Sequence, residues 1–155
     1  MGLPLAFVPK EAFMEKAIAL GREAAAAGEI PVGAVVVSSH GEILGIGRNR
    51  REQERNPLAH GEMEAIHRAA EIVGDWRLTG CDLYVTLEPC PMCMGAVLNA
   101  RIRRVIFGAE DFQTGCCGSA LDLTPLKGYP MPEMIPGFLE LDCKELLRRF
   151  FASLR

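Results

Sequence analysis

The order of apolar and helix-forming segments restricts the possible fold of this 155-residue chain more than any other feature of its sequence. An apolar segment at 32–38 is followed by a short turn and a second apolar segment at 42–48, which predicts a β-hairpin. Apolar segments at 81–87 and 103–109 predict two further strands. A hairpin that is followed by alternating helices and strands predicts an α/β protein with a mixed sheet covered by helices on both faces.

Helix-forming residues precede, separate and follow these strands. The expected helices span residues 10–27, 60–74, 91–99 and 141–155. In the second of them, Met63, Ile66, Ala70 and Val73 recur at helical spacing. We expect these four side chains to face the core.

The remaining stretches lack periodicity. Residues 49–59 are polar and contain a proline, which predicts a loop. Residues 110–137 carry glycines, prolines and paired cysteines, so we expect a long irregular segment with at most a short helical turn. With no repeat and no linker, residues 1–155 are expected to form a single domain.

Composition restricts the cell compartment and the partners. The net charge of −3 gives no overall attraction to nucleic acid, so any RNA contact needs a local basic patch. The first residues lack a basic signal region, and no apolar run is long enough to span a bilayer, so a cytoplasmic protein without membrane contact is expected. In that compartment the six cysteines stay reduced, and a C-x-x-C pair is more typical of metal binding or catalysis than of a disulfide.

The stretch TLEPCPMC places Cys90 and Cys93 three residues apart, where a predicted strand ends and a predicted helix begins. Pro91 suits the first helical position, because its missing N–H would have no partner there. Side chains at i and i+3 share one helix face, so both sulfurs are able to point at one atom, and a helix N-terminus stabilises thiolates. Alone, the pair fits a metal site and a thioredoxin-like redox pair equally well.

A second stretch, AHGEMEA, favours the metal site. His60 and Glu62 lie where a polar segment becomes a periodic helix, about 200° apart on that helix, so they are poorly placed as two ligands of one ion. One histidine with two cysteines leaves the fourth tetrahedral position of zinc open for water, as in catalytic zinc sites. A free carboxylate beside that water suits general acid/base catalysis. H-x-E followed by P-C-x-x-C is thus the pattern of a zinc-dependent deaminase.

Longer stretches extend this likeness over nearly the whole chain. They are IPVGAVVV, GRNR, NPLAHGEMEAI, DLYVTLEPCPMCMGAVLNARIRRVIFGAEDFQTGCCGS and CKELLRRFF. In these the chain resembles the cytidine/deoxycytidylate deaminase superfamily and, within it, the bacterial tRNA-specific adenosine deaminases. The resemblance implies a three-layer α/β/α sandwich around a mixed five-stranded sheet, one Zn²⁺ per subunit and a homodimer. It also implies hydrolytic conversion of adenosine to inosine at the wobble position of a tRNA anticodon.

The resemblance also assigns roles to single residues. The zinc ligands match His60, Cys90 and Cys93, and the residue that moves protons matches Glu62. Asn49 matches an asparagine that binds the target nucleoside, and Asp111 matches an aspartate near its ribose. The backbone near Gly61 and at Leu87 and Glu88 is expected to bind the reacting edge of the base. Asn49 and Asp111 are equally consistent with ordinary turn residues.

Three positions depart from the family pattern. Gly61 stands where the family has alanine in H-A-E, and its missing Cβ would widen the floor of the pocket or reposition an amide. Cys116 and Cys117 replace small residues, and we expect two buried thiols rather than a second metal site. Residues 126–138 contain no clear counterpart of an Asn-His stretch of the family.

Arginines gather in three places that would suit the phosphates of an anticodon stem-loop. The clusters are Arg48, Arg50, Arg51 and Arg55; Arg101, Arg103 and Arg104; and Arg148 and Arg149 beside Phe150 and Phe151. Basic groups with an aromatic pair fit phosphates and a flipped, stacked base, although solvated arginines and core phenylalanines explain the pattern equally well. No DNA partner is expected.

Two other functions compete with tRNA deamination. A deaminase of a free nucleobase or nucleoside, such as guanine, cytosine or an adenine derivative, would keep the zinc and Glu62 but have no use for the arginine clusters. A structural zinc module or a reduced dithiol protein would leave Glu62 idle.

Overall fold

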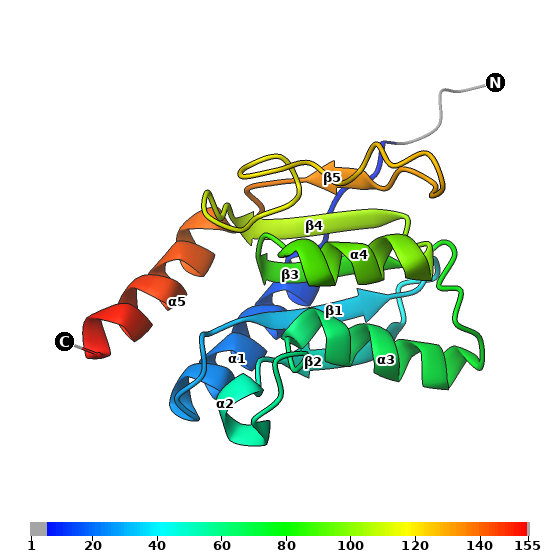
Figure 1. The fold of residues 1–155 in the computed structure, drawn as a ribbon. Coiled ribbons are helices and arrows are strands. Elements are labelled where there is room, and N and C mark those ends of the chain that lie inside the picture. Colours follow the sequence, from blue (N-terminus) through cyan, green and yellow to red (C-terminus); the bar gives the residue numbers. More distant parts are fainter. Residues whose placement is uncertain (1–5, 155) are drawn as a thin grey trace.

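The computed structural model describes residues 6–154 and contains one five-stranded mixed sheet between two layers of helices (Figure 1). The strands are β1 (Gly33–Val37), β2 (Ile43–Arg48), β3 (Asp82–Leu87), β4 (Arg104–Ala109) and β5 (Glu133–Ile135). The helices are α1 (Glu11–Ala26), α2 (Arg51–Glu54), α3 (Gly61–Val73), α4 (Pro91–Ala100) and α5 (Glu140–Ser153). The expected α/β/α class is confirmed. Residues 1–5, where a signal region was sought, and Arg155 of the last expected helix lie outside the described residues.

The sheet has the order β2-β1-β3-β4-β5. β1 is antiparallel to both of its neighbours, which confirms the hairpin, and β3, β4 and β5 are parallel to one another. The C-terminal ends of β2, β3 and β4 therefore lie beside the N-terminal end of β1. They form one of the two edges of the sheet at which strands begin or end. Ligand sites of open α/β sheets gather at the carboxyl ends of the parallel strands, so this edge is where a site is expected.

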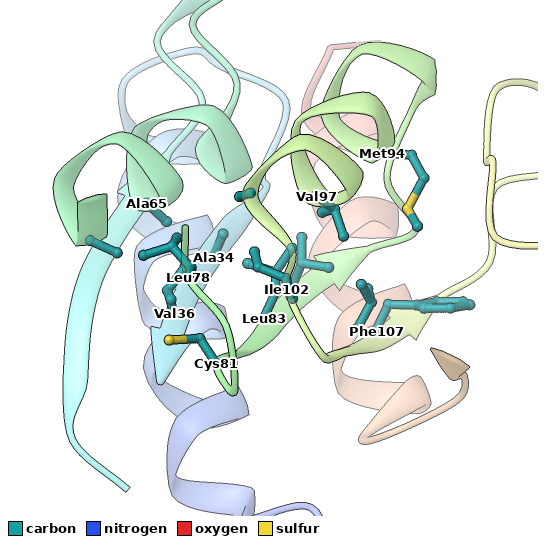
Figure 2. Packing of buried hydrophobic residues seen from close by; sticks show 14 of the residues in the cluster. Ala34, Val36, Ala65, Leu78, Cys81, Leu83, Met94, Val97, Ile102 and Phe107 are labelled. Carbon is teal, nitrogen blue, oxygen red and sulfur yellow. The ribbon is translucent and has the colours of Figure 1, made fainter. Parts of the chain in front are cut away.

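Alternation along the strands fills two cores. Val36, Leu83 and Val85 point to the layer of α3 and α4. Figure 2 shows Val36 and Leu83 together with Val97 of α4. Tyr84 and Ile106 point to the other face, where α1 and α5 cover them. Because both faces are buried, the central strands are mostly apolar, as is usual for sheets with helices on each side.

Helix α3 buries a different face from the expected one. Met63, Ile66 and Ala70 are only partly buried and Val73 is exposed, whereas the buried positions are Gly61, Glu62, Ala65 and Ala69. The cause lies in β2, where a Cβ on Gly45 or Gly47 would stand 2.2 Å from a carbonyl oxygen of α3. Strand and helix backbones thus touch, and only small residues of α3 fit the contact.

Two short elements lie in stretches that the sequence predicts as irregular. α2 is a single turn, and the backbone N–H groups of Glu52 and Gln53 donate to the buried Glu29 carboxylate over 3.0 and 2.8 Å. β5 has only three residues and pairs with β4 at the edge of the sheet. Such short elements leave no periodic pattern in a sequence. No helix within residues 6–154 is long and apolar enough to cross a membrane.

Candidate active site

Two helix N-termini meet at the strand-end edge of the sheet. His60 is the N-cap residue of α3, and Cys90 is the N-cap residue of α4, with Pro91 at the first helical position. Both N-caps have extended backbone, so their side chains leave the helix axis and turn toward the space between the helices. Cys93 lies in the first turn of α4 and is fully buried, and it brings the second sulfur to the same point.

The three donor atoms have the spacing of a zinc site. His60 Nδ1 lies 3.6 Å from Cys90 Sγ and 3.4 Å from Cys93 Sγ, and all three atoms lie within 4.8 Å of one another. A tetrahedral zinc ion holds a nitrogen and a sulfur ligand about 3.6 Å apart. Because the imidazole nitrogen converges on both sulfurs, the geometry favours a metal site over a dithiol redox pair.

A hydrogen bond between the two thiols shifts their pKa values in opposite directions. The Cys93 thiol donates to Cys90, and with help from His60 this lowers the pKa of Cys90 to about 4. The same hydrogen bond, together with burial, raises the pKa of Cys93. The hydrogen bond to Cys90 also raises the pKa of His60. Cys90 is thus already a thiolate at neutral pH, and zinc binding has to displace the proton of Cys93.

Glu62 is a buried carboxylate with an unused oxygen. The residue is only 4% exposed, and no protein group donates to its Oε1 atom. Burial raises the pKa of Glu62, although the nearby His60 opposes this. An unpartnered buried carboxylate oxygen is costly, so it points to a proton donor that arrives with a ligand. Together with the free fourth position of the three-donor set, this oxygen fits a zinc ion and a water.

A cavity of about 660 Å³ opens over these groups, within the usual size of small-molecule sites. Its lining includes His60, Glu62 and Cys90 at the centre. The surrounding wall comes from four places, namely Glu29, Ile30 and Val32 before β1; Asn49 and Arg51 after β2; Leu87, Glu88 and Pro91 after β3; and Glu110, Asp111, Phe112, Gln113 and Thr114 after β4. Leu147 and Phe151 of α5 close the remaining side.

Asn49 and Gly61 are joined by a hydrogen bond. The Gly61 N–H donates to Asn49 Oδ1 over 2.9 Å, so Asn49 has its amide NH₂ left to offer a ligand. A Cβ on Gly61 would lie 3.2 Å from Arg48 Cα and from the Val32 carbonyl oxygen, facing the strands. The expectation that this glycine widens the pocket floor is therefore wrong. Its amide is held by Asn49, and its contact with a base stays a prediction.

The other expected substrate contacts line the cavity. Leu87 is the last residue of β3 and Glu88 follows it. The Glu88 N–H donates to the Ala109 carbonyl, so a base would meet other atoms of this stretch. Asp111 follows β4, and its carboxylate accepts from the backbone of Gln113 and Thr114. Burial opposes ionisation of Asp111, but these hydrogen bonds outweigh it and lower its pKa.

The paired cysteines beside this wall are thiols without a metal-binding arrangement. Cys116 is buried, and Cys117 is partly buried with its sulfur 3.6 Å from Met94 Sδ. Burial raises the pKa of Cys117. Within residues 6–154 the one group of three or more metal-binding side chains in reach of a common ion is His60, Cys90 and Cys93. The expectation of buried thiols is confirmed for Cys116, whereas Cys117 is only partly buried.

A family model for the cytidine and deoxycytidylate deaminase zinc-binding region matches residues 8–109. The chain belongs to this deaminase family. The matched range contains the three donor residues and Glu62, and it ends before the wall at 110–114. Zinc is accordingly the cofactor of this deaminase.

Known deaminases resemble the chain in sequence and in structure. It is 44% identical over 146 residues to the tRNA-specific adenosine deaminase of Bacillus subtilis, covering 94% of this chain and 90% of the relative. A solved structure from work on A-to-I editing by tRNA:A34 deaminases at the wobble position superposes with a TM-score of 0.85 at 37% identity, covering 89% of this chain and all of that one. Guanine deaminase from B. subtilis gives a TM-score of 0.63 at 39% identity, covering 66% of each chain.

Most arginines of the three clusters lie away from the catalytic cavity of this deaminase. Arg51 alone among them lines the cavity. Arg103 and Arg104 pair with the buried Asp82 at the opposite edge of the sheet, one strand length from the site. Arg148 and Arg149 pair with Glu145 on α5. Contact of these clusters with RNA phosphates therefore stays a prediction.

Several residues of the cavity wall were not expected from the sequence. Phe112 lines the cavity and is 73% exposed, although nothing in its sequence context marked it. The position of Glu29 at the cavity was not predictable, because its hydrogen-bond partners, the N–H groups of α2, lie more than 20 residues away in the chain. The aromatic pair of the tail was expected either to stack on a base or to pack in the core, and its two rings differ. Phe150 is buried in the core, while Phe151 is 48% exposed and lines the cavity.

Proposed function

We propose that the chain is a zinc-dependent hydrolase that converts adenosine to inosine in tRNA, at the wobble position of the anticodon. The observation that carries this function is the unpartnered Glu62 Oε1 beside the donor set of His60, Cys90 and Cys93, at the floor of a cavity of about 660 Å³. The similarity to tRNA-specific adenosine deaminases over nearly the whole chain supports the choice of substrate.

In this function His60, Cys90 and Cys93 hold the zinc ion. A zinc ion supplies Lewis acidity, which lowers the pKa of water to about 7 and provides a nucleophile at neutral pH. The Cys90 thiolate is ready to bind a cation, and Pro91 fixes the start of the helix that carries both sulfurs.

Glu62 moves the protons. Its unpartnered oxygen accepts a proton from the attacking water as the new bond to C6 of adenine forms. Glu62 passes this proton to the ring nitrogen N1. It then takes the second proton of the water from the new hydroxyl group at C6 and passes it to the amino group, which leaves as ammonia. Adenosine and water thus give inosine and ammonia. Burial raises the pKa of this carboxyl group, which makes it a better proton acceptor than an exposed glutamate.

The wall of the cavity orients the nucleoside. The amide NH₂ of Asn49 is free to donate to an acceptor on the nucleoside, because its oxygen already holds Gly61. Asp111 lies beside the ribose, and Leu87 contacts a face of the base. The backbone near Gly61 and Glu88 borders the reacting edge.

The mouth of the cavity suits a polynucleotide. Arg51, 48% exposed, offers a guanidinium for a phosphate, and the exposed rings of Phe112 and Phe151 offer stacking surfaces for bases.

We also propose a cytoplasmic homodimer. Ile72 and Trp76, exposed at the end of α3 and just beyond it, supply apolar surface for a second subunit, and light scattering of the zinc-loaded protein measures its mass.

Deamination of a free purine base is the alternative, because a guanine deaminase shares this fold at 39% identity. One assay separates the two. Zinc-loaded protein is incubated with an anticodon stem-loop that carries adenosine at the wobble position, with adenosine, and with free adenine, guanine and cytosine. We expect inosine only in the stem-loop. Turnover of a free base with an unchanged stem-loop would replace the proposed substrate by that base.

A further inference from the structure

Glu88 lines the cavity, but its carboxylate is buried and is bonded only to one distant segment. Its Oε1 accepts from the Asp111 N–H over 3.1 Å and from the Ser119 hydroxyl. Its Oε2 accepts from the Cys117 N–H over 2.9 Å and from the Ser119 N–H over 3.2 Å. Glu88 is 2% exposed. Four donors use the roughly four acceptor positions of a carboxylate, so this group has no capacity left for a ligand.

The segment 111–119 is shaped around this carboxylate. A Cβ on Gly115 would lie 2.5 Å from Glu88 Cδ and 2.4 Å from the Asp111 carbonyl oxygen, so glycine lets the backbone lie flat on the carboxyl group. The Cys116 N–H donates to the Pro89 carbonyl over 2.8 Å, which adds a backbone contact beside the side-chain contacts. Outside one isolated bridge at Cys117, these residues belong to no helix or strand.

The same segment forms one wall of the cavity. Asp111, Phe112, Gln113 and Thr114 all line it. The Asp111 carboxylate accepts from the backbone N–H groups of Gln113 and Thr114, so the turn 111–114 is held together as one unit. The segment 111–119 that contains this turn is bonded to the Glu88 carboxylate through its first and last residues, Asp111 and Ser119. Because strands and helices give this wall little support, its position depends on Glu88.

We infer that Glu88 is a positioning residue: its carboxylate sets the place of the 111–114 wall and so determines how tightly the substrate is held, without touching the reacting atoms. This rests on the proposed function for the identity of the substrate. Glu88 and Glu62 thus differ in kind. Glu62 has an unpartnered oxygen for proton transfer, whereas Glu88 has both oxygens bonded to the wall.

Glu88→Gln tests the inference with almost no change in size. Each carboxylate oxygen of Glu88 accepts two hydrogen bonds from the segment 111–119. In the variant an NH₂ group replaces one of these oxygens and faces two donors, so two of the four hydrogen bonds are lost. We expect KM for the anticodon stem-loop to rise about tenfold, as for lost hydrogen bonds to a charged group. We expect kcat to change less than about threefold, because Glu62 and the zinc donors stay in place.

Two further readouts separate positioning from general damage. Zinc content is expected to stay at one per chain, and amide hydrogen exchange is expected to speed up in residues 111–119 but not in α3. Ser119→Ala removes only the hydroxyl partner and is expected to raise KM less, by about two- to fivefold. Glu42→Gln, on an exposed turn, is the matched control and is expected to change neither quantity.

The results have distinct meanings. An unchanged KM with unchanged exchange in 111–119 overturns the inference, and so does a loss of kcat at constant KM, which would place Glu88 in the chemical step. If Glu88→Gln fails to fold, Ser119→Ala decides by the same two measurements. Failure of the wild-type protein to deaminate the stem-loop refutes the proposed substrate instead. The hydrogen-exchange comparison needs no substrate and still tests the inference.

Discussion

Glu62 and Glu88 are both buried glutamates beside the zinc donors, yet their surroundings prepare them for different work. Burial raises the pKa of Glu62, and its Oε1 has no partner, so this carboxyl group is able to accept and release a proton during the reaction. Glu88 accepts four hydrogen bonds and is held as a fixed anchor. At the scale of one residue, the role of a carboxylate follows from how many of its acceptor positions the protein has already filled.

Glu62→Gln is expected to lower deamination at least about 100-fold, since an amide cannot accept the proton of the attacking water. Zinc content is expected to stay unchanged, because Glu62 is not one of the three donors. The melting temperature is expected to stay equal or to rise, because the substitution removes a buried carboxylate without a partner. Inosine formation, metal analysis and thermal unfolding measure the three effects. Glu71→Gln, exposed on the same helix, is the control; substantial turnover by zinc-loaded Glu62→Gln would contradict the assigned role.

Thiol labelling tests the electrostatics of the donor set. After zinc removal, Cys90 is expected to react with iodoacetamide at a rate almost independent of pH between 6 and 8, because a pKa of about 4 leaves it ionised throughout this range. Cys143, whose pKa burial raises to about 12, is expected to stay unlabelled in the folded protein. Mass spectrometry of the labelled peptides measures both. Zinc is expected to protect Cys90, and a Cys90 rate that rises tenfold per pH unit would show an ordinary thiol.

The contact between α3 and β2 shows how one element places chemistry carried by another. Gly45 and Gly47 let the strand backbone touch the helix, and the helix begins one residue after the zinc donor His60. A shift of this contact moves the N-terminus of α3 relative to α4, which carries the two sulfurs. Glycines of a strand thus control the spacing of a metal site that they do not touch.

Gly47→Ala is expected to destabilise the protein by about 1–3 kcal/mol, because its Cβ would lie 2.2 Å from the Gly61 carbonyl oxygen and force the helix away. Zinc affinity is expected to fall with it. Gly95→Ala on α4 is the matched comparison. No atom lies within 4 Å of its new Cβ, so the higher helix propensity of alanine is expected to stabilise by up to about 1 kcal/mol. Denaturant unfolding and zinc titration measure the effects; equal responses of the two variants would refute the packing argument.

The sequence was sufficient for the strands, the longer helices and the zinc donors, because each depends on patterns within a few neighbouring residues. It was not sufficient for the buried face of α3, since that face is decided by the glycines of β2 rather than by apolar residues of the helix. The anchoring of 111–119 on Glu88 was equally hidden, because side chain and backbone partners lie 23 to 31 residues apart. β5 and α2 were too short to leave a pattern.

At the scale of the whole molecule, the two edges of the sheet carry different charged groups. The edge with the cavity exposes Arg51, whereas Arg103 and Arg104 at the other edge are tied to the buried Asp82. Arg51 is the one arginine in the cavity lining, so the lining itself offers little positive charge to a nucleic acid. Tight binding of tRNA then depends on stacking and shape as well as on phosphate contacts.

Arg51→Gln is expected to weaken binding of the stem-loop and to reduce the salt slope, d log K/d log[salt], by about 0.7–0.9, the loss of one phosphate contact. Arg77→Gln, which lies beyond the end of α3 and stacks on Trp76, is the control and is expected to leave the slope unchanged. Fluorescence anisotropy at several salt concentrations measures both. A slope that stays the same in Arg51→Gln would remove this arginine from the RNA contact.

The placement of the zinc donors on two helix N-termini links metal occupancy to folding. His60 and Cys90 are 30 residues apart in the chain, with all of β3 between them, so one cation would act as a cross-link between separate parts of the fold. A ligand that binds only the folded state stabilises it by RT ln(1 + [L]/Kd), about 2.7 kcal/mol when zinc is at 100 times its dissociation constant. Starvation for zinc therefore does more than stop catalysis. It shortens the lifetime of the folded chain, so the amount of this protein in a cell would follow the supply of the metal.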